Sequence, residues 1–355
     1  MNVCIVGDGL ISLTLAKALV NKGINVELFS YKKVNKINKS RTIGISKANI
    51  EFFNQNILDI KKLLWEINKI EIYSDNLKNE RILNFQNEKK TLFSILRNHE
   101  LYDQLILSLK KNTFFKIKKN IKKITYENYN LIINCDVDSP LTKKYFYRQL
   151  KKKYNSYAHT TIISHKKILS NNTAVQIFTK NGPLAFLPIS NNKTSIVYSA
   201  KGSKNLDLEN IIKKYNTKYS INKFNRIFSF ELKTTSLRSY YFKNILSFGE
   251  LLHKIHPLAG QGFNMSIRDI KIFLSLVNFK LNHGLELDSS ICRDFEKKTK
   301  HKNFLFSQGI DSIYEFFNFE SKVKNSSLSK SVQFFGQNKY INKFFTKLAD
   351  NGIII

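Results

Sequence analysis

The residue types best suited to chemistry fall in the stretch HKIHPLAGQGFNMSIRD, residues 253–269. Pro257, Gly260 and Gly262 lie close together here, although the whole chain holds only 13 glycines and 4 prolines. The apolar pattern that follows predicts a helix whose first turn begins near Gly262. Glycine leaves the backbone bare, and the unpaired N–H groups of a helix N-terminus favour negative charge. The stretch therefore predicts a site for an anionic or electron-rich group.

A second glycine turn lies within residues 3–30, where VCIVGDGLISLTLAKALVNKGINVELFS reads as strand, tight turn, helix and strand. Gly7 suits the turn, and Gly9 suits a close approach of the backbone to a pyrophosphate at the helix N-terminus. Ser12 stands where the fingerprint usually has its third glycine. Glu27 is placed to accept a hydrogen bond from a ribose hydroxyl. The arrangement predicts a dinucleotide site, and the acidic Glu27 favours FAD or NAD over NADP.

The 253–269 stretch belongs to another strand–glycine–helix unit. A short apolar strand is predicted over residues 245–248, and Gly249 and Glu250 follow it directly. Two such units so far apart in the sequence indicate one ligand that is held at both of its ends. Glu250 is placed to bind a polyol or a ribose in that ligand.

These residues carry a family resemblance. GELLHKIHPLAGQGFNMSIRD (249–269) resembles the second flavin-binding motif of aromatic-ring hydroxylases with a single tightly bound FAD. Within that family, HPLAGQGFN followed by RD resembles the ubiquinone-biosynthesis hydroxylases. Further stretches resemble the same family in the same order: SRTIGIS (40–46), WEINKIEIYSD (65–75), LRNHELYDQL (96–105) and AVQIFTKNGPLAFLPI (174–189).

The resemblance covers about residues 1 to 300 and implies an α/β fold. A Rossmann-like FAD-binding domain would be interleaved with an antiparallel-sheet substrate domain, as in p-hydroxybenzoate hydroxylase, and followed by a helical C-terminal tail. Stretches rich in β-branched and aromatic residues fit that sheet. The predicted boundaries are 1–70, 91–145 and 236–305 for the discontinuous FAD-binding domain, 71–90 and 146–235 for the substrate domain, and 306–355 for the helical C-terminal segment.

The same resemblance implies an activity. In this family, reduced flavin reacts with dioxygen to give a hydroperoxide, which transfers one oxygen atom to an activated ring. The chain is thus expected to be an FAD-dependent monooxygenase that hydroxylates a polyprenylated phenol in ubiquinone biosynthesis, with NAD(P)H as electron donor. The flavin carries out the oxygen chemistry, so no general base is named. Pro257, Gly260 and Gly262 are expected to surround the flavin ring. The predicted cofactor-binding residues are Gly7, Gly9, Ser12, Glu27, Arg41, Asn98, Asp136, Gly249, Glu250, Gly260, Gln261, Gly262, Phe263 and Asn264.

Three positions depart from the family pattern. Glu250 replaces an aspartate, which keeps the carboxylate on a longer arm, and Ser12 replaces a glycine. In LIINCDVDSPLTKKYF (131–146), Asp136 matches the acid of an Asp-Gly motif, but Val137 stands in place of the glycine. That motif is associated with both FAD and the nicotinamide cofactor, so the electron donor is left open between NAD(P)H and another reductant.

Two alternative functions stay open beside the hydroxylase. One is another FAD oxidoreductase of the same fold, of the reductase or halogenase type, and the HPLAGQGFN segment argues against it. The other is a non-catalytic flavoprotein subunit of a biosynthetic complex, which Val137 keeps open. Either would retain the FAD site.

Composition narrows the class of protein further. The chain is 42% hydrophobic and 24% charged, as is typical of a globular protein. Its formal net charge of +31 is spread along the chain, and we interpret it as the codon usage of an AT-rich genome, with no nucleic-acid partner. Cys4, Cys135 and Cys292 form no CxxC pair, which indicates a reducing compartment. His253 and His256 lack neighbouring ligands, so no metal site is predicted.

No stretch approaches 18 consecutive apolar residues, so no transmembrane helix is predicted and the protein is expected to be cytoplasmic. FSQGIDSIYEFFNFES (306–321) and YINKFFTKLADNGIII (340–355) show roughly helical spacing of apolar residues. We interpret them as helices packed on the FAD domain. The alternative is a basic amphipathic surface that binds the inner membrane peripherally, which would suit a polyprenylated substrate.

Overall fold

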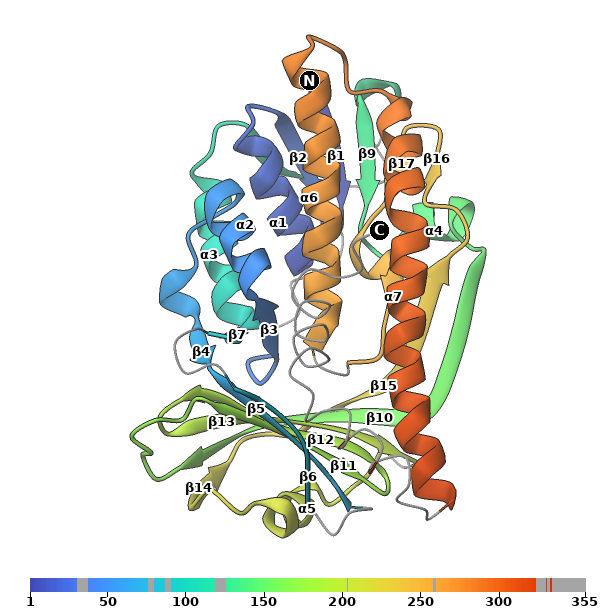
Figure 1. The fold of residues 1–355 in the computed structure, drawn as a ribbon. Coiled ribbons are helices and arrows are strands. Elements are labelled where there is room, and N and C mark those ends of the chain that lie inside the picture. Colours follow the sequence, from blue (N-terminus) through green and yellow to red (C-terminus); the bar gives the residue numbers. More distant parts are fainter. Residues whose placement is uncertain are drawn as a thin grey trace.

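The computed structural model describes residues 1–30, 38–75, 80–86, 91–118, 126–202, 204–257 and 260–323, together with residues 330 and 333. Figure 1 shows a parallel sheet flanked by helices in the upper half and a larger, strongly twisted sheet in the lower half. A long helix, α7 (Ser289–Val323), runs down one side and passes both sheets.

The upper sheet has the strand order β16-β17-β9-β1-β2-β8. All its pairings are parallel except that of β16 with β17. Val3 to Val6 of the central strand are fully buried, as expected for an apolar run covered on both faces of a parallel sheet. The strands span β1 (Asn2–Val6), β2 (Asn25–Phe29), β8 (Phe115–Lys118), β9 (Leu131–Asn134), β16 (Tyr241–Phe242) and β17 (Ile245–Ser247).

Apolar helix faces bury this sheet in one large core. Leu13, Leu105 and Phe273 are fully buried and belong to the same cluster as the strands. Figure 1 shows α1, α2, α3 and α6 together on one side of the sheet. The helices of this half span α1 (Leu10–Val20), α2 (Lys47–Asn56), α3 (Asn98–Lys110), α4 (Pro140–Tyr145) and α6 (Gln261–Asn282).

The lower sheet has the order β18-β15-β10-β13-β12-β11-β5-β6, with β14 paired to β10 off this path. Helix α5 (Leu208–Tyr215) packs against it through Leu208 and Ile212. The strands span β5 (Lys69–Ser74), β6 (Glu80–Gln86), β10 (Gln149–His165), β11 (Thr173–Thr179), β12 (Gly182–Ser190), β13 (Lys193–Lys201), β14 (Ile221–Phe224), β15 (Phe228–Leu237) and β18 (His253–Lys254).

A small antiparallel sheet joins the two halves. Its order is β3-β7-β4, with bounds Thr42–Ser46, Phe93–Arg97 and Trp65–Ile67. The hydroxyl of Thr42 lies 2.9 Å from that of Ser195 on β13, which connects β3 to the lower sheet. Among the described residues, 3₁₀ turns lie at Lys61–Leu63, Tyr126–Asn128 and η5 (Gly249–Leu251).

The elements predicted from sequence can now be placed. The helix expected from Gly262 is α6, which begins one residue earlier. LRNHELYDQL spans the end of β7 and the start of α3. Residues 146–235 contribute β10 to β15 of the lower sheet, but β15 continues to Leu237 and β18 adds a further strand from the motif segment. The 306–321 segment continues α7, and 340–355 lies outside the described residues. No helix among the described residues is both long enough and apolar enough to cross a bilayer.

Candidate active site

The N-terminus of α1 follows the carboxyl end of β1 and is open to an anion. Gly7 has a φ of 107°, and a Cβ there would lie 3.2 Å from the Cβ of Asp136. A Cβ on Gly9 would meet nothing within 4 Å. Gly9 caps α1 without a side-chain hydrogen bond, and its carbonyl accepts from the N–H of Leu13, the donor that begins the helical pattern. The preceding N–H groups of the first turn can therefore bind a ligand.

The second glycine unit packs directly on this turn. Gly249, at the start of η5, has a φ of 66°, and a Cβ there would lie 3.0 Å from Cγ2 of Ile11 in α1. A side chain at this position would be strained in the left-handed region and crowded against α1. Gly249 thus brings η5, and with it Glu250, beside the first turn of α1.

Arg41 and Glu250 meet across the site although they are far apart in sequence. Arg41 Nη2 lies 3.3 Å from Glu250 Oε1, and both side chains are more than half exposed. The backbone N–H of Asn98, at the start of α3, donates to the carbonyl of Arg41 at 3.1 Å. Three predicted cofactor-binding residues from separate segments are therefore brought together at this edge.

The N-terminus of α6 is another helix start without a side-chain cap. Gly260 precedes the helix with a φ of 62°, and no side chain caps it. Gln261 is buried, and its Oε1 has no hydrogen-bond donor among the described residues. Gly262 and Phe263 complete the first turn. Pro257 precedes this turn, and its carbonyl accepts from the N–H of Gly260 at 3.2 Å. The N–H groups of a helix start, and a buried acceptor with no donor among the described residues, would suit a polar ligand at this turn.

Asn264 was predicted to bind the cofactor, but its side chain is hydrogen-bonded to other residues of the chain. Its Oδ1 accepts from the N–H of Ser46 and from Nδ2 of Asn49, both at 2.9 Å. Its Nδ2 donates to the carbonyl of Gly44 at 3.0 Å. Both polar atoms are thus occupied by the chain itself. Asn264 fastens the first turn of α6 to β3 and α2, which positions the turn for a ligand.

Glu27 lies inside β2, where its backbone pairs in register with Cys4 of β1. Its carboxylate accepts from the hydroxyl of Tyr129 at 2.6 Å and lies 3.5 Å from Nζ of Lys118. The strand continues to Phe29 before the chain reaches the ligand-facing edge of the sheet. The sequence placed Glu27 at the end of the strand, whereas the structure shows it bonded within the sheet.

A buried pair that was not predicted from the sequence, His253 and Asp269, connects the two ends of the 253–269 stretch. His253 Nε2 lies 2.6 Å from Oδ2 of Asp269, and both side chains are at most 2% exposed. Asn303 of α7 donates to Oδ1 of the same carboxylate at 2.9 Å. This triad joins β18, α6 and α7. The RD at the end of the recognised motif was the signal for it, because Asp269 is the D.

Asp136 and Val137 follow β9 beside the Gly7 turn. The Oδ1 of Asp136 accepts from the N–H of Asp138 at 2.8 Å, and Thr142 donates to its carbonyl. Val137 is 48% exposed. Its φ is not among the positive values of the described non-glycine residues. The local backbone therefore does not require a glycine at this position.

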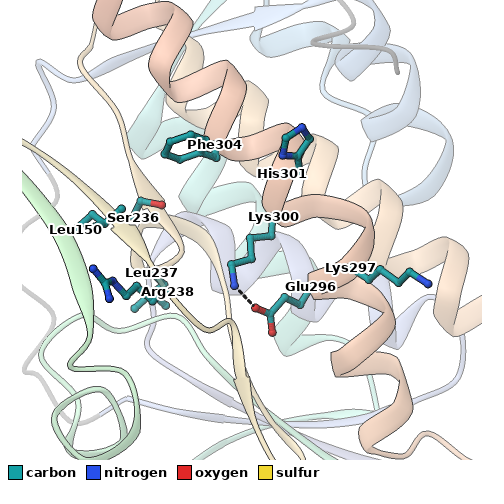
Figure 2. Close-up of a pocket in the computed structure, with 9 residues that line it drawn as sticks. All are labelled: Leu150, Ser236, Leu237, Arg238, Glu296, Lys297, Lys300, His301 and Phe304. Carbon is teal, nitrogen blue, oxygen red and sulfur yellow. Dashed lines mark hydrogen bonds and ion pairs between the residues drawn. The ribbon is translucent and has the colours of Figure 1, made fainter.

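A cavity of about 560 Å³ lies between α7 and the ends of β10 and β15. Figure 2 shows Leu150, Leu237 and Phe304 within it, with basic side chains around them. Lys300 pairs there with Glu296 at 2.6 Å. The cavity contains none of the predicted cofactor-binding residues, so it is separate from the two helix N-termini. Its lining residues are Leu150, Ser236, Leu237, Arg238, Glu296, Lys297, Lys300, His301 and Phe304.

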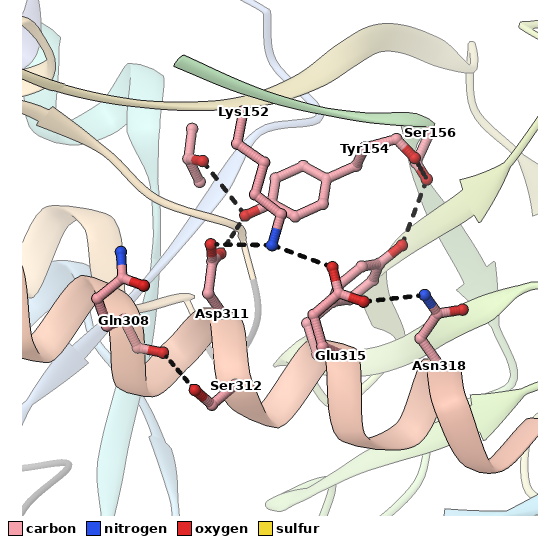
Figure 3. Close-up of polar contacts among 10 residues, drawn as sticks. Lys152, Tyr154, Ser156, Gln308, Asp311, Ser312, Glu315 and Asn318 are labelled. Atoms are coloured by element: carbon pink, nitrogen blue, oxygen red, sulfur yellow. Dashed lines mark hydrogen bonds and ion pairs between the residues drawn. The ribbon is translucent and has the colours of Figure 1, made fainter. Parts of the chain in front are cut away.

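Another polar cluster, next to the motif, joins β10 to α7. Figure 3 shows Lys152 between Asp311 and Glu315, and the hydroxyl of Tyr154 bonded to Asp311. His256 stacks edge-on against Tyr154, with ring centroids 5.2 Å apart. Neither ring nitrogen of His256 has a hydrogen-bond partner among the described residues, and burial lowers the pKa of the ring to about 4. His256 is therefore neutral at physiological pH.

Comparison with known proteins agrees with this arrangement. The p-nitrophenol 4-monooxygenase PnpA of Pseudomonas putida has a TM-score of 0.81 at 10% identity, over 99% of this chain and 98% of that one. A variant of HpxO from Klebsiella pneumoniae, solved with FAD, has a TM-score of 0.75 at 11% identity, over 98% and 99%. The fold is that of the FAD-dependent monooxygenases. The predicted fold class is confirmed.

Sequence comparison connects this FAD-dependent monooxygenase fold to ubiquinone biosynthesis. The chain is 20% identical to the mitochondrial ubiquinone biosynthesis monooxygenase COQ6 of Dictyostelium discoideum, over 89% of this chain and 84% of the relative. It is 25% identical to the Schizosaccharomyces pombe COQ6, over 35% and 26%. It is 27% identical to the 3-demethoxyubiquinol 3-hydroxylase of Escherichia coli, over 39% and 38%. The last two matches span well under half of each relative. No family model matches the chain. The predicted resemblance to this subgroup is confirmed.

The site residues of this monooxygenase fold fit FAD. Two uncapped helix N-termini suit the pyrophosphate and the flavin ring, and Gly9 leaves open space before the first of them. The Arg41–Glu250 pair lies at the same edge as the Gly7 turn, and Gln261 offers a buried acceptor. The individual residue assignments stay predictions.

Proposed function

We propose that the chain is an FAD-dependent monooxygenase that hydroxylates the aromatic ring of a polyprenylated phenol in ubiquinone biosynthesis. The observation that carries the proposal is the contact between the two glycine units. Gly249 packs on α1, and Glu250 pairs with Arg41, so segments far apart in sequence form one site. The fold shared with an FAD complex and the similarity to ubiquinone-biosynthesis enzymes support it.

Each part of the site has a defined role in this proposal. FAD, when bound, supplies the activation of dioxygen. The first-turn N–H groups of α1 would hold the pyrophosphate, and those of α6 would stabilise the negative charge of the reduced ring. Glu250 would bind hydroxyl groups of the cofactor, while Arg41 balances its charge. Asn264 and the His253–Asp269 pair hold α6 in position.

The FAD site can be tested with a matched pair of glycine variants. Gly9→Glu places a carboxylate in the open space before α1, where it would repel the pyrophosphate. Gly309→Glu makes the same change on α7, at a glycine that also has nothing within 4 Å of its Cβ position. We expect Gly9→Glu to weaken FAD binding at least tenfold, about 1.4 kcal/mol, and Gly309→Glu to leave it unchanged. Flavin fluorescence titration measures both, and equal effects would contradict the proposed site.

Hydroxylation itself needs a separate assay. Reconstituted protein, NADH or NADPH, dioxygen and a prenylated phenol should give a product that is heavier by one oxygen atom. Mass spectrometry with ¹⁸O₂ identifies the source of that atom. A reduced or halogenated product would instead support another FAD oxidoreductase of the same fold.

The electron donor is proposed to be NAD(P)H. Asp136 keeps its place beside Gly7, and the backbone at Val137 does not need a glycine. The replacement of the motif glycine by Val137 is the observation that favours the second candidate, a non-catalytic flavoprotein subunit. Anaerobic addition of NADH and NADPH separates the two. Bleaching of the flavin absorption supports the hydroxylase, whereas bands that persist support the subunit or another donor.

We further propose that the cavity on α7 contacts a membrane that carries anionic lipid. Leu150 and Phe304 are exposed there, and Arg238, Lys297 and Lys300 line the same cavity. An apolar centre with a basic border is the pattern of peripheral membrane contact. Such a contact would bring the site close to a substrate that resides in the bilayer.

Vesicle sedimentation tests the membrane proposal. The double variant Lys297→Glu/Lys300→Glu should release the protein from vesicles that contain phosphatidylglycerol. Lys61→Glu/Lys62→Glu changes the net charge equally at two exposed lysines of a 3₁₀ turn. If both variants lose binding to the same extent, net charge alone accounts for it and the α7 cavity has no special role.

A further inference from the structure

The carboxylate that binds an adenosine ribose in a Rossmann-like fold stands at the carboxyl end of the second strand. In this chain Glu27 does not reach that place. It lies opposite Cys4 in the β1–β2 register, and β2 continues to Phe29. Tyr129 and Lys118 already contact its carboxylate. A glutamate held within the sheet by two neighbours is not available to a ligand at the edge.

The residue after the strand end is Ser30, and it contacts another acid. The Ser30 hydroxyl donates to Oδ2 of Asp8 at 2.5 Å. Asp8 lies between Gly7 and Gly9, in the turn after β1. The glycine turn therefore supplies the carboxylate of Asp8 at the carboxyl end of β2, where β2 itself is followed by a serine. The bond fixes the direction of the Asp8 side chain toward the edge between β1 and β2.

The surroundings of Asp8 leave room for a ligand. Asp8 is half-buried and Gly9 is exposed, with nothing within 4 Å of its Cβ position. Ser30 is the hydrogen-bond donor to Asp8 among the described residues, and it uses one carboxylate oxygen. Tyr102 lies near enough to Asp8 for their electrostatic interaction to matter: burial raises the pKa of the Tyr102 hydroxyl most, and the negative charge of Asp8 raises it further.

We propose that Asp8, oriented by Ser30, is the carboxylate that binds the ribose hydroxyls of the adenosine half of FAD, and that Glu27 serves the sheet alone. This assignment rests on the proposed FAD binding. With one oxygen held by Ser30, the other can accept from a ribose hydroxyl, a charge-assisted hydrogen bond. A carboxylate here also repels a ribose phosphate, so the site is suited to an unphosphorylated ribose.

The test compares three variants with two flavins. Protein freed of flavin is titrated with FAD and with FMN, which lacks the adenosine, and binding is followed by flavin fluorescence. Asp8→Asn should weaken FAD about ten- to hundredfold, the range for a hydrogen bond to a charged group. It should leave FMN affinity unchanged, because FMN lacks the adenosine ribose that Asp8 is proposed to bind. Ser30→Ala should weaken FAD binding less than Asp8→Asn does, since the Asp8 carboxylate remains.

Glu27→Gln completes the test. It should keep FAD affinity within about twofold of the wild type while it lowers the urea midpoint, because the bond from Tyr129 is no longer charge-assisted and the ion pair with Lys118 is lost. Weak FAD binding by Glu27→Gln together with normal binding by Asp8→Asn overturns the assignment. A loss of FMN and FAD affinity together in Asp8→Asn also overturns it. A wild-type protein that binds no FAD overturns the proposed function as well, so the two failures are distinguishable.

Discussion

Replacing Asn264 by alanine tests whether this motif residue acts on the chain or on the cofactor. The change removes one acceptor each from the Ser46 N–H and the Asn49 amide, and one donor from the Gly44 carbonyl. Asn264 and Asn49 are at most 3% exposed. A buried polar group left without a partner costs about 1–3 kcal/mol. The Asn49 amide keeps a second bond to the Asn264 carbonyl, so we expect a loss of about 2–4 kcal/mol in the free energy of unfolding.

The assay is urea unfolding of the flavin-free protein, followed by fluorescence and circular dichroism. Asn282→Ala, at the exposed far end of the same helix, is the matched control and should change stability by less than about 0.7 kcal/mol. A loss below about 0.5 kcal/mol in Asn264→Ala would refute the reasoning. If flavin-free stability is unchanged but FAD affinity falls, Asn264 binds the cofactor directly, as its place in the motif predicted.

Three further outcomes are expected. Gly249→Ala should cost about 1–2 kcal/mol for its left-handed backbone and more for the contact with Ile11. Adding Ile11→Ala should remove only the cost of the contact with Ile11 and not the backbone cost. A double-mutant cycle in urea measures that coupling. Burial lowers the pKa of His256 from 6.5 to about 4. Because the unfolded chain takes up a proton on His256 more readily than the folded protein, the free energy of unfolding is highest above about pH 6.5. It falls, by up to about 3 kcal/mol, as the pH drops toward 4. His256→Gln should flatten that part of the urea-stability profile, and an unchanged profile would contradict it. Val137→Gly should leave FAD affinity within about twofold, because the Val137 side chain is half exposed, and fluorescence titration checks this.

Local patterns predicted several elements because their causes are local. The apolar run of β1, the glycine turn and the helical spacing of α1 lie in one continuous segment, and all three appear at the expected places. The same holds for the start of α6 after Gly260. A strand buried on both faces and a helix with one apolar stripe each have a recognisable period.

Predictions that depended on the third dimension were less complete. Counting residues from Gly7 placed Glu27 near the end of its strand, but the strand runs two residues further, and Tyr129 approaches from a segment about 100 residues away. Asn264 was assigned to the cofactor from its motif, and its partners lie more than 200 residues earlier. No periodicity in the sequence records such partners.

The sequence by itself determined the residue types of the site: two glycine turns, each before an uncapped helix, with acids close by. These follow from backbone sterics and helix ends, which act over a few residues. Tertiary structure alone decided which partner each acid contacts and which acids are buried. Asp8 meets Ser30 because the parallel strands β1 and β2 end at the same edge, whereas Glu250 meets Arg41 and Asp269 meets His253 through the packing of helices, turns and antiparallel strands around that sheet. Charge and hydrogen-bond partners depend on distance in space, so the role of each carboxylate is settled by packing.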